Sequence, residues 1–350
     1  MEKRRLGSIE VSPIGMGCMA FSHGYGEVPQ EAYAINAIQR AHEYGCTLFD
    51  TAEGYGQQQF YAGHNEQLVG KAVSGFRHEV VVATKFHLGR ETVYESDLRT
   101  EWLMRQHLEQ SLRNLRTDYI DLYYLHRVSR HVPVEAVARV MGDFIREGLI
   151  RGWGLSQVTA QTLQRAHEVT RVSAVQNIYS MVERDCEAEV LPYTLTEGIG
   201  VVPFSPIASG LLSGCVTTAT DFSHPDDVRK FVPQLTPPQN IEANQPLLDL
   251  LGDYAGRKGA TMAQIALAWM LRKQPNVVPI PGSRNLDRIM ENLGAWDIVL
   301  SDAEFVALER AIEGIEIYGH RGIEEYEDGS MSDWHREKTK ANKLQTDTEK

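Results

Sequence analysis

The chain has 350 residues, of which 42% are hydrophobic and 23% charged, so it can supply a sizeable buried core and wholesale disorder is excluded. Its 47 acidic and 35 basic residues give a net charge of −12 without any basic stripe, and we expect no nucleic-acid partner. No segment approaches the roughly 20 apolar residues of a membrane span, and the start, MEKRRLGSIEVSPIG, lacks a signal-peptide apolar run. We therefore expect a cytoplasmic protein with no membrane contact.

Short β-branched runs alternate along the chain with longer helical stretches, a pattern typical of a parallel sheet covered by helices. In chain order, the predicted strands are 14–18, 47–50, 80–85, 120–126, 150–156, 174–176, 200–204 and 277–280. The helices predicted after the first four strands are about 30–44, 66–73, 99–115 and 133–147. Eight consecutive strand–helix units favour a closed (β/α)8 barrel of the α/β class over an open sheet, because closure removes both edge strands.

Three segments break this rhythm. The N-terminal residues 3–15 read as two short strands around Gly7 and Ser8, which predicts a hairpin at the bottom of the barrel. A long, proline-rich insertion covers about 206–243, and insertions that follow barrel strands lie at the catalytic face, often as lids. A polar tail runs from about Gly329 to the end. We predict one barrel domain over residues 1–315 and a C-terminal extension over 316–350.

Polar side chains of complementary chemistry fall where predicted strands end. Asp50 ends the second strand, Lys85 the third and His126 the fourth, while Tyr55 follows Asp50 in the loop TAEGYG. Each of these residues alone has an ordinary structural explanation, such as a helix cap or a core histidine. The carboxyl ends of barrel strands share one mouth, however, so the four together predict an active site.

This set of residues suits proton transfer to a carbonyl oxygen while a hydride reaches its carbon. A phenol is a poor acid at neutral pH, and we expect the Lys85 ammonium to stabilise the phenolate and lower the pKa of Tyr55. Asp50 would hold Lys85 charged, and His126 would donate a hydrogen bond to the substrate oxygen. The protein contains no hydride source, which implies a nicotinamide cofactor.

Seven segments carry a family pattern in order: LFDTAEGYG (48–56), ATKF (83–86), DLYYLHR (121–127), RGWGLSQ (151–157), AVQNIYS (174–180), VPFSPIASGLL (202–212) and IPGSRNLDRIMENLGA (280–295). Over about residues 3–315 the chain resembles the aldo-keto reductases. The resemblance implies a (β/α)8 barrel that binds NADP(H) across its mouth without a Rossmann fold and reversibly reduces aldehydes and ketones to alcohols. It places Asp50, Tyr55, Lys85 and His126 on the family's catalytic tetrad, with Tyr55 as the general acid.

The same resemblance implies the cofactor contacts. Ser156, Gln157 and Gln176 would bind the nicotinamide carboxamide, and Phe204 would stack on its ring. The other implied cofactor contacts are Met19, Asp50, the run Ser205, Pro206, Ile207, Ala208 and Ser209 at the pyrophosphate, Gly282, the 2′-phosphate contacts Ser283, Arg284 and Arg288, and the adenine contacts Glu291 and Asn292. Two guanidinium groups favour NADPH over NADH, although Asn285 and Asp287 weaken that preference.

Other interpretations of the sequence remain open. Lys85 could form a Schiff base, as in a lyase, or the chain could be a nicotinamide-binding regulatory subunit with little turnover. No metal is expected, because His126 and His131 lack a third ligand at usable spacing and the four cysteines lie far apart. The GxGxxA match at 15–20 is not followed by a helix pattern and is read as chance. The loops around 21–25, 86–88, 127–131 and Tyr318 would shape a pocket for a carbonyl substrate of moderate size, while the oligomeric state is not readable.

Overall fold

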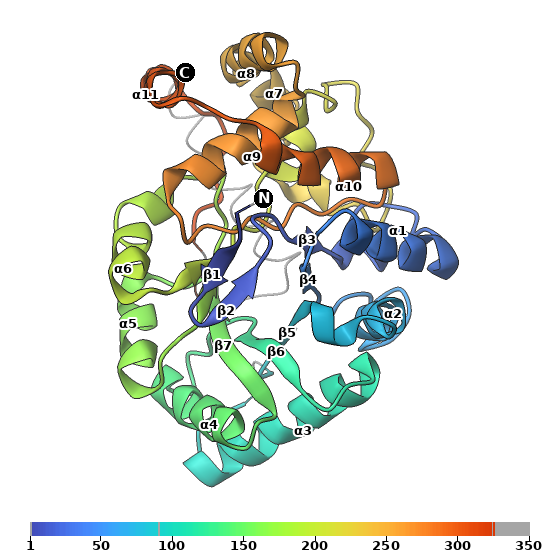
Figure 1. Cartoon of the computed structure of the whole chain (residues 1–350), viewed down its shortest axis with the longest axis vertical. Coiled ribbons are helices and arrows are strands. Elements are labelled where there is room, and N and C mark those ends of the chain that lie inside the picture. The colour runs from blue at the N-terminus through green and yellow to red at the C-terminus, as the bar shows by residue number, and fades with distance from the viewer. Residues whose placement is uncertain (1, 90–91, 324, 326–350) are drawn as a thin grey trace.

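The computed structural model describes residues 2–89, 92–323 and 325. Its parallel strands, hydrogen-bonded in this order, are β3 (Met16–Gly17), β4 (Leu48–Asp50), β5 (Val81–Phe86), β6 (Ile120–Leu125), β7 (Ile150–Ser156), β8 (Ala174–Gln176) and β9 (Gly200–Val201). Figure 1 shows this sheet curling into a ring that is surrounded by helices. The polar tail predicted from about Gly329 lies outside the described residues.

The ring is closed by the chain between β9 and β3. The Val278 N–H donates to the Val201 carbonyl at 2.7 Å, and the Gly15 N–H donates to the Pro279 carbonyl at 2.9 Å. An isolated parallel bridge also joins Gly17 to Gly282. These bonds join the first strand to the last, so the sheet closes into the predicted (β/α)8 barrel.

Three of the predicted strands are shorter or more irregular than expected. The strand predicted over 14–18 is regular only in β3 and the one over 200–204 only in β9, while the one predicted over 277–280 has a single isolated bridge, from Val277 to Val201. Pro203, Pro279 and Pro281 cause this difference, because proline has no N–H to donate to a ladder.

Helices cover the outside of the barrel (Figure 1). They are α1 (Glu31–Glu43), α2 (His64–Val73), α3 (Asp97–Leu115), α4 (Val134–Arg146), α5 (Ala160–Val169), α6 (Val190–Glu197), α7 (Gln239–Ala243), α8 (Gln245–Lys258), α9 (Met262–Lys273), α10 (Leu286–Leu293) and α11 (Asp302–Glu313). The predicted starts differ from these by one or two residues. For α3 the reason is a cap, since the Ser96 hydroxyl accepts a hydrogen bond from the Arg99 N–H and begins the helix at Asp97.

Two hydrophobic cores stabilise the barrel, one between the sheet and the helices and one inside the ring. The inner core holds small and branched side chains of the strands, such as Val81, Leu122 and Ala174. It is continuous with Leu6 and Ile9 of the N-terminal hairpin formed by β1 (Arg4–Leu6) and β2 (Ile9–Val11). The predicted hairpin therefore seals one end of the barrel with apolar side chains.

The other end is partly covered by the insertion and by the chain that follows α11. The insertion carries the short 3-10 helices η4 (Ala208–Ser213) and η5 (Val228–Phe231). It is fastened to the loop after β3, where the Val228 N–H donates to the Gly24 carbonyl at 3.0 Å and a bridge joins Tyr25 to Asp227. The insertion thus lies beside the mouth, as expected for a lid segment.

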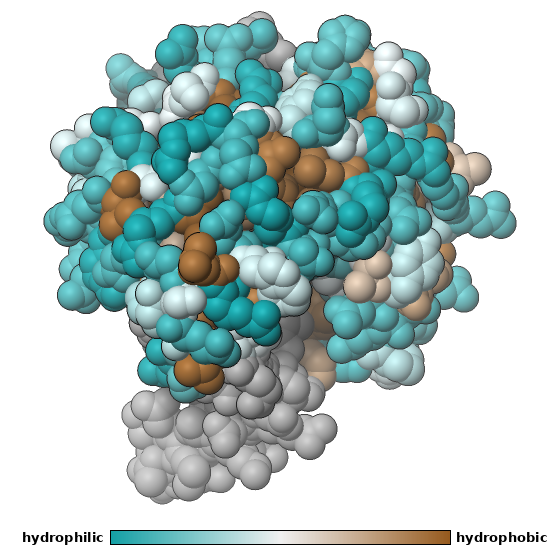
Figure 2. All heavy atoms as spheres, turned by 90° about the horizontal axis from the view of Figure 1, so that it is seen from below, coloured by the Kyte–Doolittle hydropathy of each residue, from teal (hydrophilic) through white to brown (hydrophobic). Residues whose placement is uncertain are grey.

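The face of the molecule drawn in Figure 2 is mostly hydrophilic, and its hydrophobic side chains are scattered. Within the described residues, none of the helices combines the length and the apolar character that crossing a membrane requires.

Candidate active site

The period of two along the barrel strands brings the predicted catalytic residues together. Val81 and Ala83 of β5 face the inner core, so Lys85 continues the inner row at the carboxyl end of the strand. By the same alternation, Asp50 ends the inner row of β4 and His126 directly follows that of β6. Three of the four predicted catalytic side chains therefore come from rigid strand ends.

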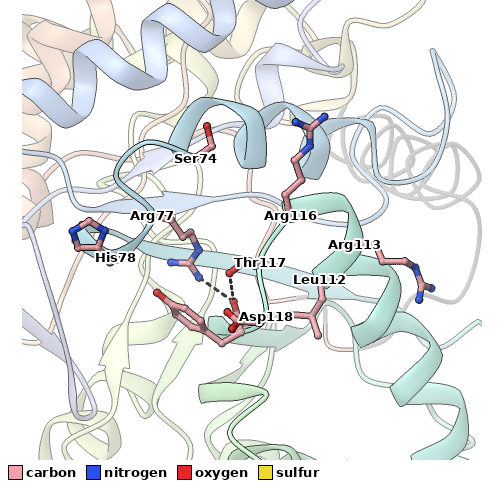
Figure 3. Close-up of a pocket in the computed structure, with 9 residues that line it drawn as sticks. Ser74, Arg77, His78, Leu112, Arg113, Arg116, Thr117 and Asp118 are labelled. Carbon is pink, nitrogen blue, oxygen red and sulfur yellow. Dashed lines mark hydrogen bonds between the residues drawn. The ribbon is translucent and has the colours of Figure 1, made fainter.

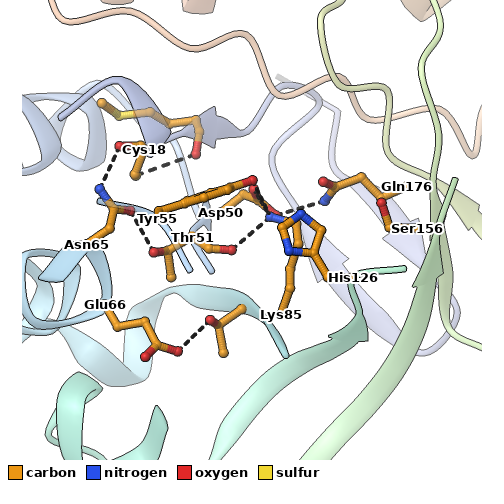
Figure 4. Close-up of polar contacts among 12 residues, drawn as sticks. Cys18, Asp50, Thr51, Tyr55, Asn65, Glu66, Lys85, His126, Ser156 and Gln176 are labelled. Carbon is orange, nitrogen blue, oxygen red and sulfur yellow. Dashed lines mark hydrogen bonds and ion pairs between the residues drawn. The ribbon is translucent and has the colours of Figure 1, made fainter. Parts of the chain in front are cut away.

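The Lys85 ammonium is the centre of the site (Figure 4). Its Nζ donates to Asp50 Oδ1 at 2.5 Å, to the Thr51 carbonyl at 2.8 Å and to Tyr55 Oη at 3.1 Å. The Lys85 side chain is fully buried, and the other carboxylate oxygen of Asp50 accepts a hydrogen bond from Gln176 Nε2 at 2.8 Å. All three donors of the ammonium are satisfied, so its position is fixed.

Tyr55 lies on the loop after β4, and its neighbour Glu53 holds that loop in place. The Glu53 N–H donates to the Lys85 carbonyl at 3.0 Å. The Glu53 carboxylate accepts from the His87 N–H at 2.8 Å and pairs with His107 of α3 at 2.8 Å. Glu53 therefore ties the phenol-bearing loop both to β5 and to the helix layer.

A second buried group supports the same region and was not anticipated from the sequence. Asn65 Oδ1 accepts from the Thr51 hydroxyl at 2.6 Å, while its Nδ2 donates to the Cys18 carbonyl at 2.9 Å. Glu66 accepts from the Thr84 hydroxyl at 2.7 Å, and burial raises the pKa of this carboxyl. Polar residues at the start of a helix usually indicate capping. The sequence alone therefore does not reveal that Asn65 and Glu66 hydrogen-bond the strand ends beside the active site.

Burial controls the protonation of the central groups. Burial alone would lower the pKa of Lys85, but the charges of Asp50 and Tyr55 outweigh it and raise that pKa, so the ammonium stays protonated. Burial also raises the pKa of Tyr55, and the opposing effect of Lys85 is smaller. Lys85 therefore lowers the pKa of Tyr55, as expected, but burial raises that pKa by more, so the net shift is upward. The phenol is held protonated, as a proton donor must be.

His126 stands next to Tyr55 at the mouth. The centroids of the two rings are 5.8 Å apart, with the rings nearly perpendicular. Burial lowers the pKa of His126 well below its usual range, and the nearby charges of Arg127 and Lys85 add to this effect. The imidazole is thus neutral at neutral pH, and its ring N–H can donate one hydrogen bond to a ligand.

These groups open into a cavity of about 750 Å³ at the barrel mouth. Of the residues predicted to bind a cofactor, those lining it are Met19, Asp50, Ser156, Gln176, Phe204, Ser205, Pro206, Ile207, Ser209, Gly282, Ser283, Arg284, Arg288, Glu291 and Asn292. Two of the residues predicted to bind the cofactor do not line the cavity. Ala208 is buried, and the side chain of Gln157 is turned to the backbone, where its Oε1 accepts from the Ile178 N–H at 3.0 Å. Of the loops expected to shape a substrate pocket, His23, Tyr25 and Arg127 reach the cavity.

The backbone after Phe204 is unusually curved. Three residues without a glycine's freedom have left-handed φ values, 51° at Ser205, 48° at Ala208 and 54° at Ser209. Such conformations cost roughly 1–3 kcal/mol each, and they cluster at ligand-binding sites. A residue in the right-handed backbone conformation followed by residues in the left-handed one also turns successive N–H groups toward the same side, which forms a concave site that suits an anion.

The far end of the cavity carries cationic groups at the start of α10. Asn285 caps this helix by accepting from the Arg288 N–H at 3.1 Å, and Arg284 directly precedes the cap. The Arg284 guanidinium donates to the Glu27 carbonyl. Two arginines beside a helix N-terminus form a suitable environment for a phosphate group.

A second, open groove of about 650 Å³ lies away from the mouth (Figure 3). It is lined by residues that follow α2 and α3 and precede the next strands, including Ser74, Arg116 and Asp118. Within it the Arg77 guanidinium is already held by the Tyr119 carbonyl at 3.0 Å and by Asp121 at 2.7 Å. This groove is at the opposite end of the strands, where barrel residues serve stability.

Among the described residues, no group of three or more His, Cys, Asp or Glu side chains could hold a metal ion. Three of the predicted catalytic residues, Asp50, Tyr55 and His126, line the same cavity at the barrel mouth as the arginines that suit a phosphate group, which makes this cavity the candidate active site. Its groups can donate a proton beside a surface that suits an extended, anionic ligand.

Comparison with known proteins identifies the family to which this architecture corresponds. A family model described as "Aldo/keto reductase family" matches residues 13–313. "Probable aldo-keto reductase 1" of Glycine max is 34% identical over 322 residues, which span 89% of this chain and 88% of that protein. A crystal structure of an aldo/keto reductase from Klebsiella pneumoniae in complex with NADP and acetate is 27% identical, with a TM-score of 0.68 over 89% of this chain and 95% of that one. The glycerol dehydrogenase of Gluconobacter oxydans is 25% identical, with a TM-score of 0.78 over 94% and 98% of the two chains.

Proposed function

Since the chain belongs to the aldo/keto reductase family and is an NADP(H)-dependent oxidoreductase that reduces carbonyl groups, we propose that Tyr55 is its general acid, assisted by Asp50, Lys85 and His126. The observation that carries this proposal is the Lys85 ammonium, which donates to both Tyr55 Oη and Asp50 at the mouth. A buried ion pair bonded to a phenol has no structural purpose that apolar packing would not serve as well.

The cavity at the barrel mouth, called the cofactor groove below, supports this assignment because its lining offers groups that suit each part of NADPH. We propose that the curved segment 205–209 receives the pyrophosphate, that Arg284 and Arg288 receive the 2′-phosphate, and that Phe204 stacks on the nicotinamide. Met19, Ser156, Gln176, Gly282, Ser283, Glu291 and Asn292 line the same groove and would complete the contacts. Ala208 and Gln157 would act by shaping this groove, because neither lines it. When bound, NADPH supplies a hydride to the carbonyl carbon.

The chain's own residues then deliver the proton. The carbonyl oxygen would lie between Tyr55 Oη and the neutral imidazole of His126, each of which can donate a hydrogen bond to it. As negative charge grows on that oxygen, the phenolic proton moves to it, and the Lys85 ammonium stabilises the phenolate that remains. Asp50 keeps the ammonium in place throughout, since burial would otherwise favour the neutral amine.

The same geometry opposes Schiff-base chemistry at Lys85. A nucleophilic amine must lose its proton, whereas the charges of Asp50 and Tyr55 raise the pKa of Lys85. The amine is also fully buried behind Tyr55 and Asp50. Borohydride trapping with a carbonyl substrate is expected to leave Lys85 unmodified.

The cofactor assignment is tested with Arg284→Ala. Loss of one charge-assisted contact to the 2′-phosphate should raise the Kd for NADPH by about 10-fold or more while leaving the Kd for NADH nearly unchanged. Isothermal titration calorimetry of both cofactors measures this, with Arg99→Ala on the exposed face of α3 as the control. An equal effect on NADPH and NADH would remove Arg284 from the 2′-phosphate site.

The finer assignments follow from the surroundings of the site. We propose a substrate of moderate size, an aldehyde or ketone, because aromatic and apolar side chains such as Met19, Tyr25 and Phe204 line the cavity together with Tyr55. A panel of such carbonyls, followed by NADPH absorbance, would identify it. We also propose that residues 1–315 form the catalytic unit, with the extension from 316 covering part of its mouth. All four cysteines are free thiols, which supports a reducing, cytoplasmic setting.

A further inference from the structure

The chain that follows α11 returns to the mouth and is anchored there by backbone contacts. The Asn244 side chain bonds both peptide groups of Tyr318, with Nδ2 donating to its carbonyl at 2.9 Å and Oδ1 accepting from its N–H at 3.0 Å. Gly319 has a φ of +83°, and a Cβ there would lie 2.3 Å from the Pro233 carbonyl oxygen. Only glycine fits, so residues 318–319 are packed directly against the insertion.

A buried carboxylate then fixes the next residues. Glu183, only 3% exposed, accepts hydrogen bonds from the N–H of Arg321 at 2.6 Å and of Gly322 at 3.0 Å. It also accepts from Gln234 Nε2 of the insertion and pairs with His320 at 3.1 Å. Three segments that are distant in sequence therefore meet at one carboxylate, and the backbone of Arg321 is held on both sides.

This anchoring places the Arg321 side chain in the cofactor groove. Arg321 lines the mouth cavity, and its guanidinium carbon lies 5.6 Å from the centroid of the Phe204 ring. Phe204 directly precedes the curved segment 205–209. The phenol of Tyr25 hydrogen-bonds Ser209 of that segment, and Arg229 and Arg321 both lie within electrostatic reach of it, with Arg229 having the larger effect.

A pyrophosphate bound along the segment 205–209 would need cations from outside that segment. The segment itself, SPIAS, has no cationic side chain, although a pyrophosphate carries negative charge on both phosphoryl groups. Arg229 of the insertion and Arg321 of the C-terminal extension both line the cavity, and Asp227 orients Arg229 through two guanidinium nitrogens at 2.6 and 2.9 Å. Arg284 and Arg288 stand at the adenosine end of the groove.

We propose that Arg321, seated by Glu183, binds the pyrophosphate of the nicotinamide cofactor. The C-terminal extension would thus add a cofactor contact to those that the barrel strands and their loops supply. This inference rests on the proposed function, because it takes the groove along 205–209 as the cofactor site. A pyrophosphate is common to NADPH and NADH, whereas the 2′-phosphate occurs only in NADPH, and the two arginine sites can therefore be separated.

The test is calorimetric titration of the full chain with NADPH and with NADH. Arg321→Ala should raise the Kd for both cofactors by the same factor, about 10-fold or more, as expected for one charge-assisted hydrogen bond. Arg321→Lys, which keeps the charge but loses the planar fork, should show a smaller rise. Arg284→Ala provides the contrast, since its effect should fall on NADPH alone. Arg310→Ala, an exposed arginine of α11, is the matched control and should change neither value.

Each alternative outcome overturns a different statement. If the wild-type chain binds NADPH and Arg321→Ala binds both cofactors equally well, the inference fails and the proposed function stands. If cofactor affinity is unchanged but the KM for 4-carboxybenzaldehyde rises relative to that for benzaldehyde, Arg321 serves a substrate carboxylate and the inference is again wrong. If the wild-type chain binds neither cofactor, the proposed function and this inference fail together. Thermal melting of each variant verifies that the fold is retained.

Discussion

Replacing Tyr55 by phenylalanine removes one oxygen from the site and little else. The Lys85 ammonium keeps its contacts with Asp50 Oδ1 at 2.5 Å and the Thr51 carbonyl at 2.8 Å, so no charged group loses all its partners. We expect the free energy of unfolding to change by less than about 1.5 kcal/mol, the typical net value of one hydrogen bond. The aromatic ring that contacts His126 remains.

The rate of carbonyl reduction should fall much further than stability. Loss of a general acid lowers the rate by at least about 100-fold, which corresponds to about 2.7 kcal/mol of transition-state free energy. Single-turnover decay of NADPH absorbance with a saturating carbonyl measures this step, and calorimetry should show nearly unchanged NADPH binding. Tyr61→Phe is the matched control, because Tyr61 lies on the same loop with an exposed phenol bonded to Gln67. If Tyr55→Phe keeps more than about a tenth of the wild-type rate, another group donates the proton and the reasoning is refuted.

Two further predictions concern the buried charges. Lys85→Met should lower the free energy of unfolding by roughly 3–5 kcal/mol because Asp50 loses its cation, and adding Asp50→Asn should recover much of that loss. Urea denaturation measures both, with Lys71→Met as the control, because Lys71 is partly exposed and its partner Glu31 lies at the surface. Docking of the C-terminal extension should depend on pH through Glu183 and His320. Hydrogen bonding to Glu183 raises the pKa of His320, so its contribution is complete below about pH 6.5 and is lost as the pH rises through that raised value. Burial opposes ionisation of Glu183, but bonds from His320 and two backbone N–H groups outweigh it and lower its pKa, so that contribution is complete above about pH 4.3 and is lost as the pH falls through the lowered value. Hydrogen exchange of residues 318–323 should show the greatest protection between the lowered pKa of Glu183 and the raised pKa of His320. In His320→Gln, the loss of protection at high pH should disappear. A pH profile in that variant identical to that of the wild type would contradict the role of His320.

The sequence was sufficient to predict those features that depend on local periodicity. Alternation by two along β4, β5 and β6 places Asp50, Lys85 and His126 on the inner side of the barrel at strand ends, and the number of strand–helix units gives the fold. The strand predicted over 277–280, which lies between β9 and β3, is less regular than expected, because Pro279 and Pro281 interrupt a hydrogen-bond ladder that β-branched residues would otherwise favour. The lowering effect of Lys85 on the pKa of Tyr55 was predicted correctly, but the larger opposing effect of burial was not, because the extent of burial is not visible in a sequence.

Features that depend on distant segments could not be predicted. Glu183 reads as an ordinary loop carboxylate, yet it bonds the insertion through Gln234 and the extension through Arg321. The left-handed backbone at Ser205 and Ser209 has no sequence signal either, since glycine or asparagine would be the usual indication of a positive φ. Both depend on tertiary contacts that hold the chain in conformations its local sequence does not favour.

The two ends of the barrel divide stability from function. The hairpin end is sealed by Leu6 and Ile9, which belong to the apolar core inside the ring and whose burial favours the folded state. The mouth concentrates what is costly: the fully buried pair of Asp50 and Lys85 and the strained backbone at 205–209. Buried ion pairs are often no more stable than apolar residues of the same shape, and left-handed non-glycine residues persist only when their surroundings enforce them. Both unfavourable features lie at the carboxyl ends of the strands, within one cavity. The residues and backbone conformations at the mouth therefore serve ligand binding and proton transfer rather than the stability of the fold.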